Sequence, residues 1–150
     1  MEIISYFDSN NKEHWAEEIQ KSDWAPAALL VTFLDEKAFI ENRGEGGKIL
    51  LLVDGERLVS FCIYAPRDNI VNTTLTPWMG FVYTFPEHRG HHYAGELLKE
   101  VNRLAKQEGH KHVYVSTRHV GLYEKYGCEY LETIHDVDDK DHRVYVHTVK

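Results

Sequence analysis

The residues best suited by type and spacing to bind a ligand lie at 85–98. Here a turn rich in small, basic and imidazole-bearing residues leads into an amphipathic helix pattern. This stretch reads FPEHRGHHYAGELL and follows the apolar run Met79–Tyr83. The first N–H groups of a helix have no partner within it, and the helix dipole places partial positive charge beside them. Arg89 adds a fixed charge, and small residues let a phosphate approach the backbone. The pattern predicts a phosphate-binding turn, with a plain turn and helix cap as the alternative.

The spacing of this loop matches neither GxxxxGK[ST] nor GxGxxG, the common nucleotide-binding patterns. It resembles instead the Q/R-x-x-G-x-G/A signature of the GNAT superfamily of N-acetyltransferases, whose loop cradles the pyrophosphate of coenzyme A. Arg89 fills the first position and Ala94 the last, whereas His92 stands where the family usually has glycine. We expect a histidine to supply the same backbone N–H only if its φ and ψ angles are ordinary and its side chain points away.

A second motif lies downstream at Leu122–Gly127, which reads LYEKYG and is followed by Cys128. It resembles the Leu-Tyr-Glu-Lys-x-Gly-Phe helix of the same superfamily, with cysteine in place of phenylalanine. With both motifs in the family's order, the chain is identified as a member of the GNAT superfamily. The resemblance implies acetyl-CoA as co-substrate and direct acetyl transfer in a ternary complex to a primary amine of a small molecule or peptide. A non-catalytic module that binds or senses coenzyme A is the alternative.

The resemblance also implies roles for individual residues. Tyr123 matches the tyrosine that protonates the departing thiolate in many members, and a phenol with a pKa of about 10 holds its proton at neutral pH; a purely packing role remains open. The backbone N–H of Val82 matches the group, usually at a bulge, that binds the thioester carbonyl, and Thr84 is expected to pair with the pantetheine. The expected cofactor-binding set is Val82, Thr84, Arg89, Gly90, His91, His92, Tyr93, Ala94, Gly95, Ser116 and Tyr123.

No motif in the sequence supplies a general base for the acceptor amine. Some family members have a glutamate on the strand before the loop, but the matching residue here is Trp78, which cannot accept a proton. A water chain and an amine that arrives neutral are both open. The titratable candidates, none of them supported by a motif, are Asp68, His119, His135 and Asp136.

The hydrophobic pattern predicts the elements that position these motifs. Strands are expected at 1–7, 49–53, 58–64, 77–85, 111–117, 129–137 and 143–149, and helices at 10–19, 26–34, 97–105 and 120–126. Asn10 and Glu13 resemble a capping box for the first helix. Because strand–helix–strand crossovers are right-handed, strands 77–85 and 111–117 should be parallel. The predicted fold is a single mixed α/β domain over residues 1–150, with a mostly antiparallel sheet, one parallel β-α-β crossover and flanking helices, as the GNAT resemblance also implies.

Composition limits the cellular compartments and the classes of binding partner that fit this protein. The 150 residues carry a net charge of −7 without a run of Lys and Arg, which argues against nucleic acid and favours a cationic or neutral acceptor. No apolar run approaches the ~20 residues of a membrane span, and the N-terminus lacks the features of a signal peptide. The ten histidines and two cysteines show no metal-ligand spacing. We therefore expect a cytoplasmic monomer or homodimer without a membrane association or a bound metal.

Overall fold

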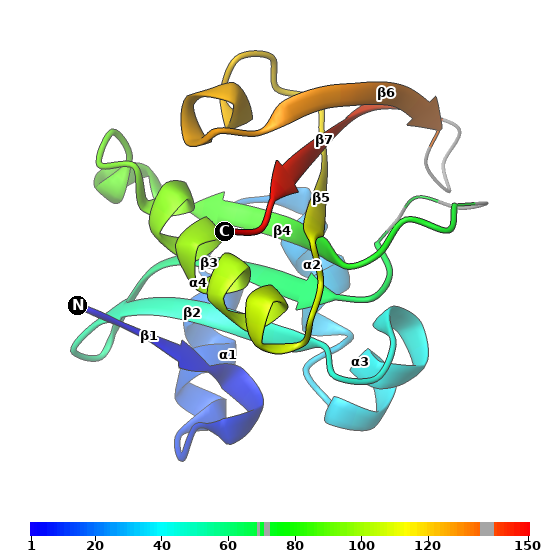
Figure 1. The fold of residues 1–150 in the computed structure, drawn as a ribbon. Coiled ribbons are helices and arrows are strands. Elements are labelled where there is room, and N and C mark those ends of the chain that lie inside the picture. Colours follow the sequence, from blue (N-terminus) through cyan, green and yellow to red (C-terminus); the bar gives the residue numbers. More distant parts are fainter. Residues whose placement is uncertain (69, 71–72, 136–139) are drawn as a thin grey trace.

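The computed structural model describes residues 1–68, 70, 73–135 and 140–150 of the chain (Figure 1). Within these ranges a seven-stranded sheet has the order β1-β2-β3-β4-β5-β7-β6. Neighbouring strands are antiparallel except for the parallel pair β4 and β5. The strands are β1 (Glu2–Ser5), β2 (Lys48–Asp54), β3 (Arg57–Ala65), β4 (Trp78–Thr84), β5 (His112–Thr117), β6 (Glu129–His135) and β7 (Asp141–Thr148). The predicted mixed sheet with one parallel crossover is confirmed.

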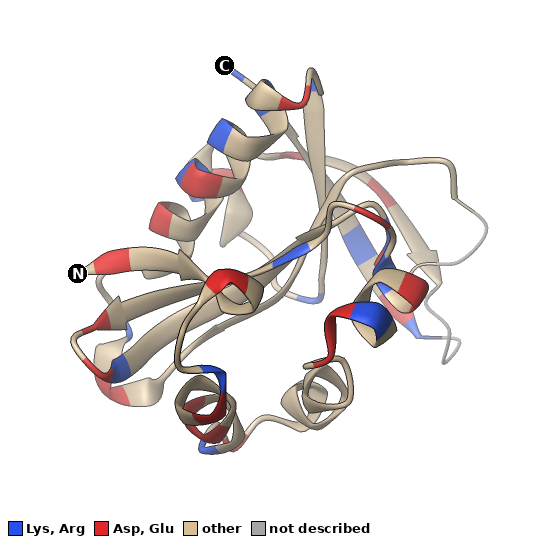
Figure 2. Cartoon of the chain, turned by 90° about the horizontal axis from the view of Figure 1, so that it is seen from below, with Lys and Arg blue, Asp and Glu red and all other residues tan. Residues whose placement is uncertain are grey.

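The helices lie on both faces of this sheet. The long helix α4 covers one face, and α1 and α2 cover the opposite face (Figures 1 and 2). The α-helices are α1 (Lys12–Gln20), α2 (Ala25–Val31), α3 (Glu36–Arg43) and α4 (Tyr93–Gln107), and the 3₁₀ turns are η1 (Tyr6–Asp8), η2 (Pro86–His88) and η3 (Tyr123–Tyr126). No helix of the described residues combines the length and apolar character needed to cross a bilayer.

The interior strand β2 shows why the sheet needs helices on both faces. Successive side chains of a strand point to opposite faces, and β2 is apolar at every interior position. Ile49 and Leu51 pack in the cluster that contains α1, α2 and α3, whereas Leu50 and Leu52 pack in the cluster that contains α4. Each face of the sheet is therefore covered by its own hydrophobic layer.

The N-terminal third departs most from the predicted elements. The first helix has Asn11 as its N-cap residue and lacks a side-chain cap, so the predicted capping box at Asn10 is wrong. The helix expected over 26–34 ends at Val31, and α3 follows as a helix of its own. Asp35 caps α3 by accepting a hydrogen bond from the Ala38 N–H at 3.3 Å. This aspartate was the local signal for α3, but a short helix with few buried positions shows weak periodicity.

The helix expected over 120–126 is reduced to the single turn η3. Gly121 and Gly127, on either side of it, have φ angles of 88° and 86°, in the left-handed region that ends a helix. The LYEKYG motif therefore forms a tight turn against α4 and β6 rather than a full helix. Residues 136 and 137, at the end of the strand expected at 129–137, lie outside the described residues.

Candidate active site

A bulge interrupts β4 at the centre of the molecule. The register between β3 and β4 shifts between Phe61 and Ile63, so that Phe81 and Val82 together lie opposite Cys62. Phe81 has a φ angle of 48°, which a bulky residue rarely adopts. A bulge leaves one residue outside the strand ladder and turns its backbone groups in a new direction. This is the setting that the resemblance implied for the Val82 N–H.

The bulge lies just beyond the point where β4 and β5 separate. Parallel pairing ends at Met79 and Val115, and the described residues contain no later pair between these strands. Both strands nevertheless continue, β4 to Thr84 and β5 to Thr117 (Figure 1). The edge of β4 that faces β5 is therefore open from the bulge onward. An extended ligand with amide groups can add to such an edge as a further strand would.

The loop after β4 enters α4 without a side-chain cap. His92 is the N-cap residue, with φ 61° and ψ 32°, which is the left-handed conformation. Ordinary φ and ψ angles were the condition under which a histidine was expected to supply the same backbone N–H, and His92 does not meet that condition. The chain turns sharply here, and glycine is the residue that makes such a turn without strain. The His92 side chain is exposed, so it leaves the first turn accessible. The N–H groups of Tyr93 and Ala94 belong to that turn, whose donors have no acceptor within the helix.

Arg89 is bound to the end of β4 rather than extended over the loop. Its Nε donates a hydrogen bond to the Thr84 carbonyl oxygen at 2.9 Å, and its Cζ lies 5.5 Å from the centroid of the Tyr83 ring. Tyr83 in turn stacks on Trp24, with centroids 5.1 Å apart and 17° between the ring planes. The guanidinium is exposed at the surface while its stem ties the loop to the strand. The sequence motif did not indicate this positioning contact.

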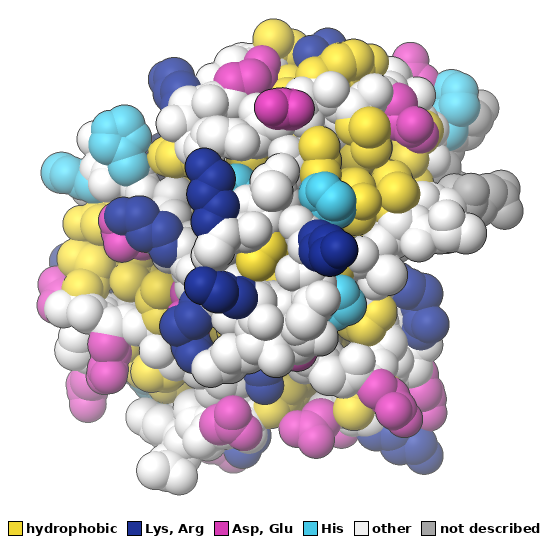
Figure 3. Space-filling view, in the orientation of Figure 1, with side chains coloured by type: hydrophobic (Ala, Val, Ile, Leu, Met, Phe, Trp, Pro, Cys, Tyr) yellow, Lys and Arg dark blue, Asp and Glu magenta, His cyan; other side chains and the backbone are white. Residues whose placement is uncertain are grey.

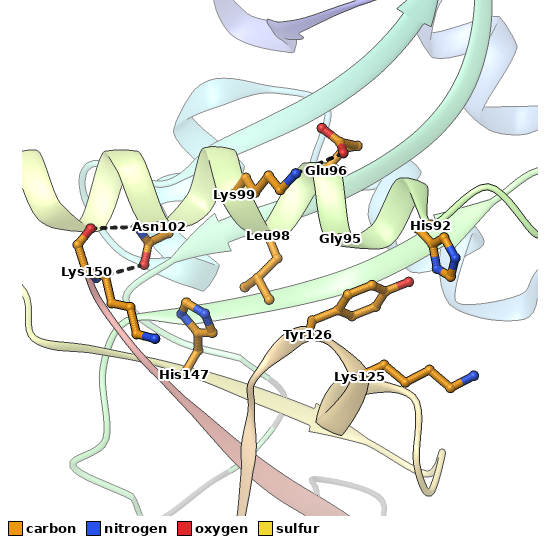
Figure 4. Close-up of a pocket in the computed structure, with 10 residues that line it drawn as sticks. All are labelled: His92, Gly95, Glu96, Leu98, Lys99, Asn102, Lys125, Tyr126, His147 and Lys150. Carbon is orange, nitrogen blue, oxygen red and sulfur yellow. Dashed lines mark hydrogen bonds and ion pairs between the residues drawn. The ribbon is translucent and has the colours of Figure 1, made fainter.

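Tyr123 is buried on the α4 side of the sheet. Its side chain packs in the same core cluster as Cys62, the residue opposite the bulge, and Val82 borders that cluster. Burial raises the pKa of the Tyr123 phenol, and the nearby Cys62 and Cys128 thiols add to this effect. A neutral phenol is therefore maintained well above pH 7. Tyr126, in the same turn, is half-exposed and points instead toward the start of α4 (Figure 4).

A pocket of about 460 Å³ lies between α4, η3 and the end of β7 (Figure 4). It collects basic and imidazole side chains from separate segments: His92, Lys99, Lys125, His147 and Lys150. Lys99 also pairs with Glu96 at 3.2 Å. Burial and Lys150 lower the pKa of His147, so the lysines supply the positive charge at pH 7. Figure 3 shows basic side chains gathered over this face, a grouping that no run of the sequence reveals.

The other predicted cofactor residues border the same region in different ways. The Thr84 hydroxyl lies 2.9 Å from that of Ser60, and Ser116 pairs with Val144 of β7, beyond the end of the β4–β5 pairing. Gly90 has a φ angle of 88°, and a Cβ built on it would contact no atom within 4 Å, so this residue lies at the open surface of the loop. Gly95 differs, because it lies under the ring of Tyr126 and has a packing reason to be glycine.

The four candidate bases are far from equivalent in the fold. The Asp68 carboxylate reaches β4 at Gly80, immediately before the bulge. His135 lies on the edge strand β6 and pairs with Asp141 at 2.9 Å, where both side chains are exposed. His119 is exposed after β5, and Asp136 lies outside the described residues. Trp78, at the position of the family's glutamate, is fully buried. Among residues 1–68, 70, 73–135 and 140–150, no group of three His, Cys, Asp or Glu side chains is placed to hold a metal.

A family model described as an acetyltransferase (GNAT) domain matches residues 13–131 of the chain. No curated protein matches the sequence. The matched range contains both sequence motifs, the bulge and every residue of the expected cofactor-binding set.

Solved structures share this fold at low sequence identity. A candidate GNAT-family acetyltransferase from Desulfovibrio desulfuricans is 12% identical, with a TM-score of 0.72 and 99% of each chain covered. An aminoglycoside 6′-N-acetyltransferase complexed with coenzyme A is 17% identical, with a TM-score of 0.69 over 100% of this chain and 98% of that one. The aminoglycoside 6′-N-acetyltransferase from Enterococcus faecium is 15% identical, with a TM-score of 0.68 and the same coverage.

Proposed function

The chain belongs to the GNAT family of acetyltransferases, and from this premise we propose that it moves an acetyl group from acetyl-CoA directly to a primary amine in a ternary complex. The bulge at Phe81 and Val82 carries the proposal. The open edge of β4 begins at this bulge, Val82 borders the core cluster that contains Tyr123, and the uncapped helix α4 packs in the same cluster. A thioester bound along β4 would therefore have its reacting carbon beside both a backbone donor and a proton donor.

Three regions of the site fit three parts of coenzyme A, namely its diphosphate, its pantetheine arm and the phosphate on its ribose. The first turn of α4 and the loop at 89–92 would bind the diphosphate through N–H groups and the helix dipole. The open edge of β4 from Val82 to Thr84 would pair with the amides of the pantetheine arm. Lys99, Lys125 and Lys150 would attract the phosphate on the ribose, since their pocket adjoins the first turns of α4.

Two groups of the chain would assist the transfer itself. The Val82 N–H would stabilise the negative charge that builds on the thioester oxygen, and one such donor contributes roughly 3–4 kcal/mol in comparable oxyanion holes. Tyr123 would give its proton to the sulfur as the carbon–sulfur bond breaks. Its burial keeps the phenol neutral and thus able to donate.

The acceptor would approach from the opposite face of the sheet, on the side that carries α1 and α2. A cavity of about 650 Å³ there is lined by Trp24, Asp23 and neighbouring residues of α2. An aromatic face beside a carboxylate suits a cationic amine. We infer that the acceptor is a small cationic amine or an exposed amino group of a peptide. The aminoglycoside acetyltransferases among the similar structures make aminoglycosides the first compounds to screen.

Two measurements test the proposal. Acetyl-CoA should raise the melting temperature, with a gain of roughly 2.7 kcal/mol at 100 times Kd. Release of free thiol from acetyl-CoA should then identify an acceptor among polyamines, aminoglycosides, amino acids and peptides. Binding without thiol release in the presence of any amine would favour the coenzyme A-sensing module instead, and the absence of binding at millimolar acetyl-CoA would overturn both.

A further inference from the structure

The carboxylate of Asp68 lies over β4 immediately before the bulge. Its side chain is 8% exposed, and its Oδ1 lies 3.7 Å from Nη1 of Arg43, whose side chain is 5% exposed. A Cβ built on Gly80 would lie 2.7 Å from the same Oδ1. Only glycine at position 80 therefore allows the carboxylate to approach the strand so closely. The chain holds a buried negative charge against the one strand that carries the proposed oxyanion donor.

Asp68 and Tyr123 lie on opposite faces of the sheet. The guanidinium that pairs with Asp68 lies 5.3 Å from the Phe33 ring and 5.2 Å from the Phe81 ring, in the layer of α1, α2 and α3. Tyr123 packs in the layer of α4. The two groups are nevertheless near enough for the charge of Asp68 to add to the raised pKa of Tyr123. The bulge thus has a neutral phenol, able to donate a proton, on the α4 side of the sheet and a carboxylate on the side of α1, α2 and α3.

The spacing along β4 suits a proton transfer. Gly80, over which Asp68 lies, precedes Val82 by two residues, a separation of about 7 Å in an extended strand and less in a bulge. A carbonyl group bound at the Val82 N–H and a nitrogen attacking its carbon occupy a span of this order. A proton on that nitrogen would then lie within reach of Asp68, directly or through one water.

We propose that Asp68 is the general base of the transfer, an inference that rests on the proposed function. Asp68 accepts a proton from the amine as the nitrogen–carbon bond forms. Tyr123 supplies a proton to the sulfur as the carbon–sulfur bond breaks. Exchange with water returns the proton from Asp68 to solvent and restores the phenol, so that an amine and a thioester give an amide and a thiol.

Contacts other than those of the Asp68 carboxylate also hold this segment against α3. The Arg67 N–H donates to the Arg43 carbonyl at 2.9 Å, and the Arg67 guanidinium donates to the carbonyls of Glu41 and Asn42. These bonds tie the segment to α3 without the Asp68 carboxylate. Among the charged and titratable groups of the described residues, Arg43 from α3 pairs with Asp68, Arg67 is next to it in the chain, and Tyr123 from η3 senses its charge through the sheet.

The test compares Asp68→Asn, Asp68→Glu and the exposed control Asp54→Asn, using an acceptor found by thiol release. Asp68→Asn should lower kcat by about 10²–10⁴-fold near pH 7 while KM for the amine changes little. Its residual rate should rise about tenfold per pH unit toward the pKa of the amine, whereas the wild-type profile levels off earlier. Asp68→Glu should recover part of the rate, and Asp54→Asn should match the wild type.

Acetyl-CoA binding distinguishes a failure of the role proposed for Asp68 from a failure of the proposed function. The rise in melting temperature caused by acetyl-CoA should be equal in the wild type and in Asp68→Asn. A variant that keeps this shift and also keeps the wild-type kcat and pH profile would overturn the role of Asp68. Should Asp68→Asn fail to fold, Asp68→Ser takes its place, because it also removes the carboxylate. A folded Asp68→Ser with the wild-type kcat and pH profile would overturn the role equally. If acetyl-CoA does not raise the melting temperature of the wild type, the proposed function itself is overturned.

Discussion

The ring of Tyr126 lies so close to Gly95 that no side chain fits between them. A Cβ built on Gly95 would lie 2.7 Å from Cε1 of Tyr126. This contact joins the two motifs of the sequence, because Gly95 is in the first turn of α4 and Tyr126 is in η3 (Figure 4). The width of the pocket between α4 and η3 is therefore set by a single glycine.

Gly95→Ala should destabilise the protein by about 1–3 kcal/mol, because the added methyl group forces η3 away from α4. In a Tyr126→Ala background the same change should stabilise it by up to about 1 kcal/mol, since alanine is the better helix former. Urea unfolding of the four proteins in this cycle measures both values. The same sign in both backgrounds would contradict the packing argument.

Tyr123→Phe should lower kcat by about 10²–10⁴-fold and leave the acetyl-CoA affinity nearly unchanged, since the ring still packs and only the proton donor is lost. Steady-state kinetics and a thermal shift with acetyl-CoA measure the two effects. Tyr126→Phe is the matched control in the same turn and should cost less. Full turnover by Tyr123→Phe would assign the phenol a packing role only.

His92→Gly should leave stability unchanged or raise it by up to about 1 kcal/mol, because glycine adopts the left-handed conformation of His92 without the strain of a Cβ. The greater freedom of glycine in the unfolded chain offsets part of this gain. His91→Gly is the matched control, since His91 has a negative φ angle, and it should lower stability. A clear rise in the Kd of acetyl-CoA for His92→Gly would show that the imidazole contacts the ligand.

Lys125→Ala should weaken coenzyme A binding and reduce the salt dependence of that binding, because one charge of the basic pocket is lost. Titration calorimetry with coenzyme A and with dephospho-coenzyme A identifies the phosphate concerned. The variant should lose affinity for the first ligand and little for the second. Lys37→Ala, on α3, is the control and should leave both affinities unchanged.

Stability should fall as the pH rises above about 8.5, the pKa of an exposed thiol. Burial raises the pKa of the Cys128 thiol to about 11 and raises that of Cys62 further. A thiol with a folded-state pKa above its unfolded value stabilises the fold fully below the unfolded pKa, and this contribution is lost as the pH approaches the folded value. Urea unfolding of Cys128→Ala under reducing conditions should show a shallower decline between pH 8.5 and 11. An unchanged slope would exclude the thiol as a cause.

The sequence alone determined the elements whose signals are local. The Asp54-Gly55 turn, the alternation of Val113 and Val115, and the apolar spacing from Leu97 to Ala105 depend only on neighbours along the chain. They predicted the β2–β3 hairpin, β5 and α4, and the two motifs around Arg89 and Tyr123 led to the correct family. The short helix α3 and the reduced turn η3 were missed because few residues carry their signal.

Tertiary structure decided how the site is assembled. The bulge at Phe81 depends on the register between β3 and β4, which no local pattern specifies. Asp68 reaches Gly80 only because the segment after β3 folds back over β4 and is tied to α3. Lys99, Lys125 and Lys150 meet in one pocket although they belong to three different segments. Contacts between residues that are distant in the sequence arise from the packing of separate segments. The spacing of residues along the chain indicates only the periodicity of each element.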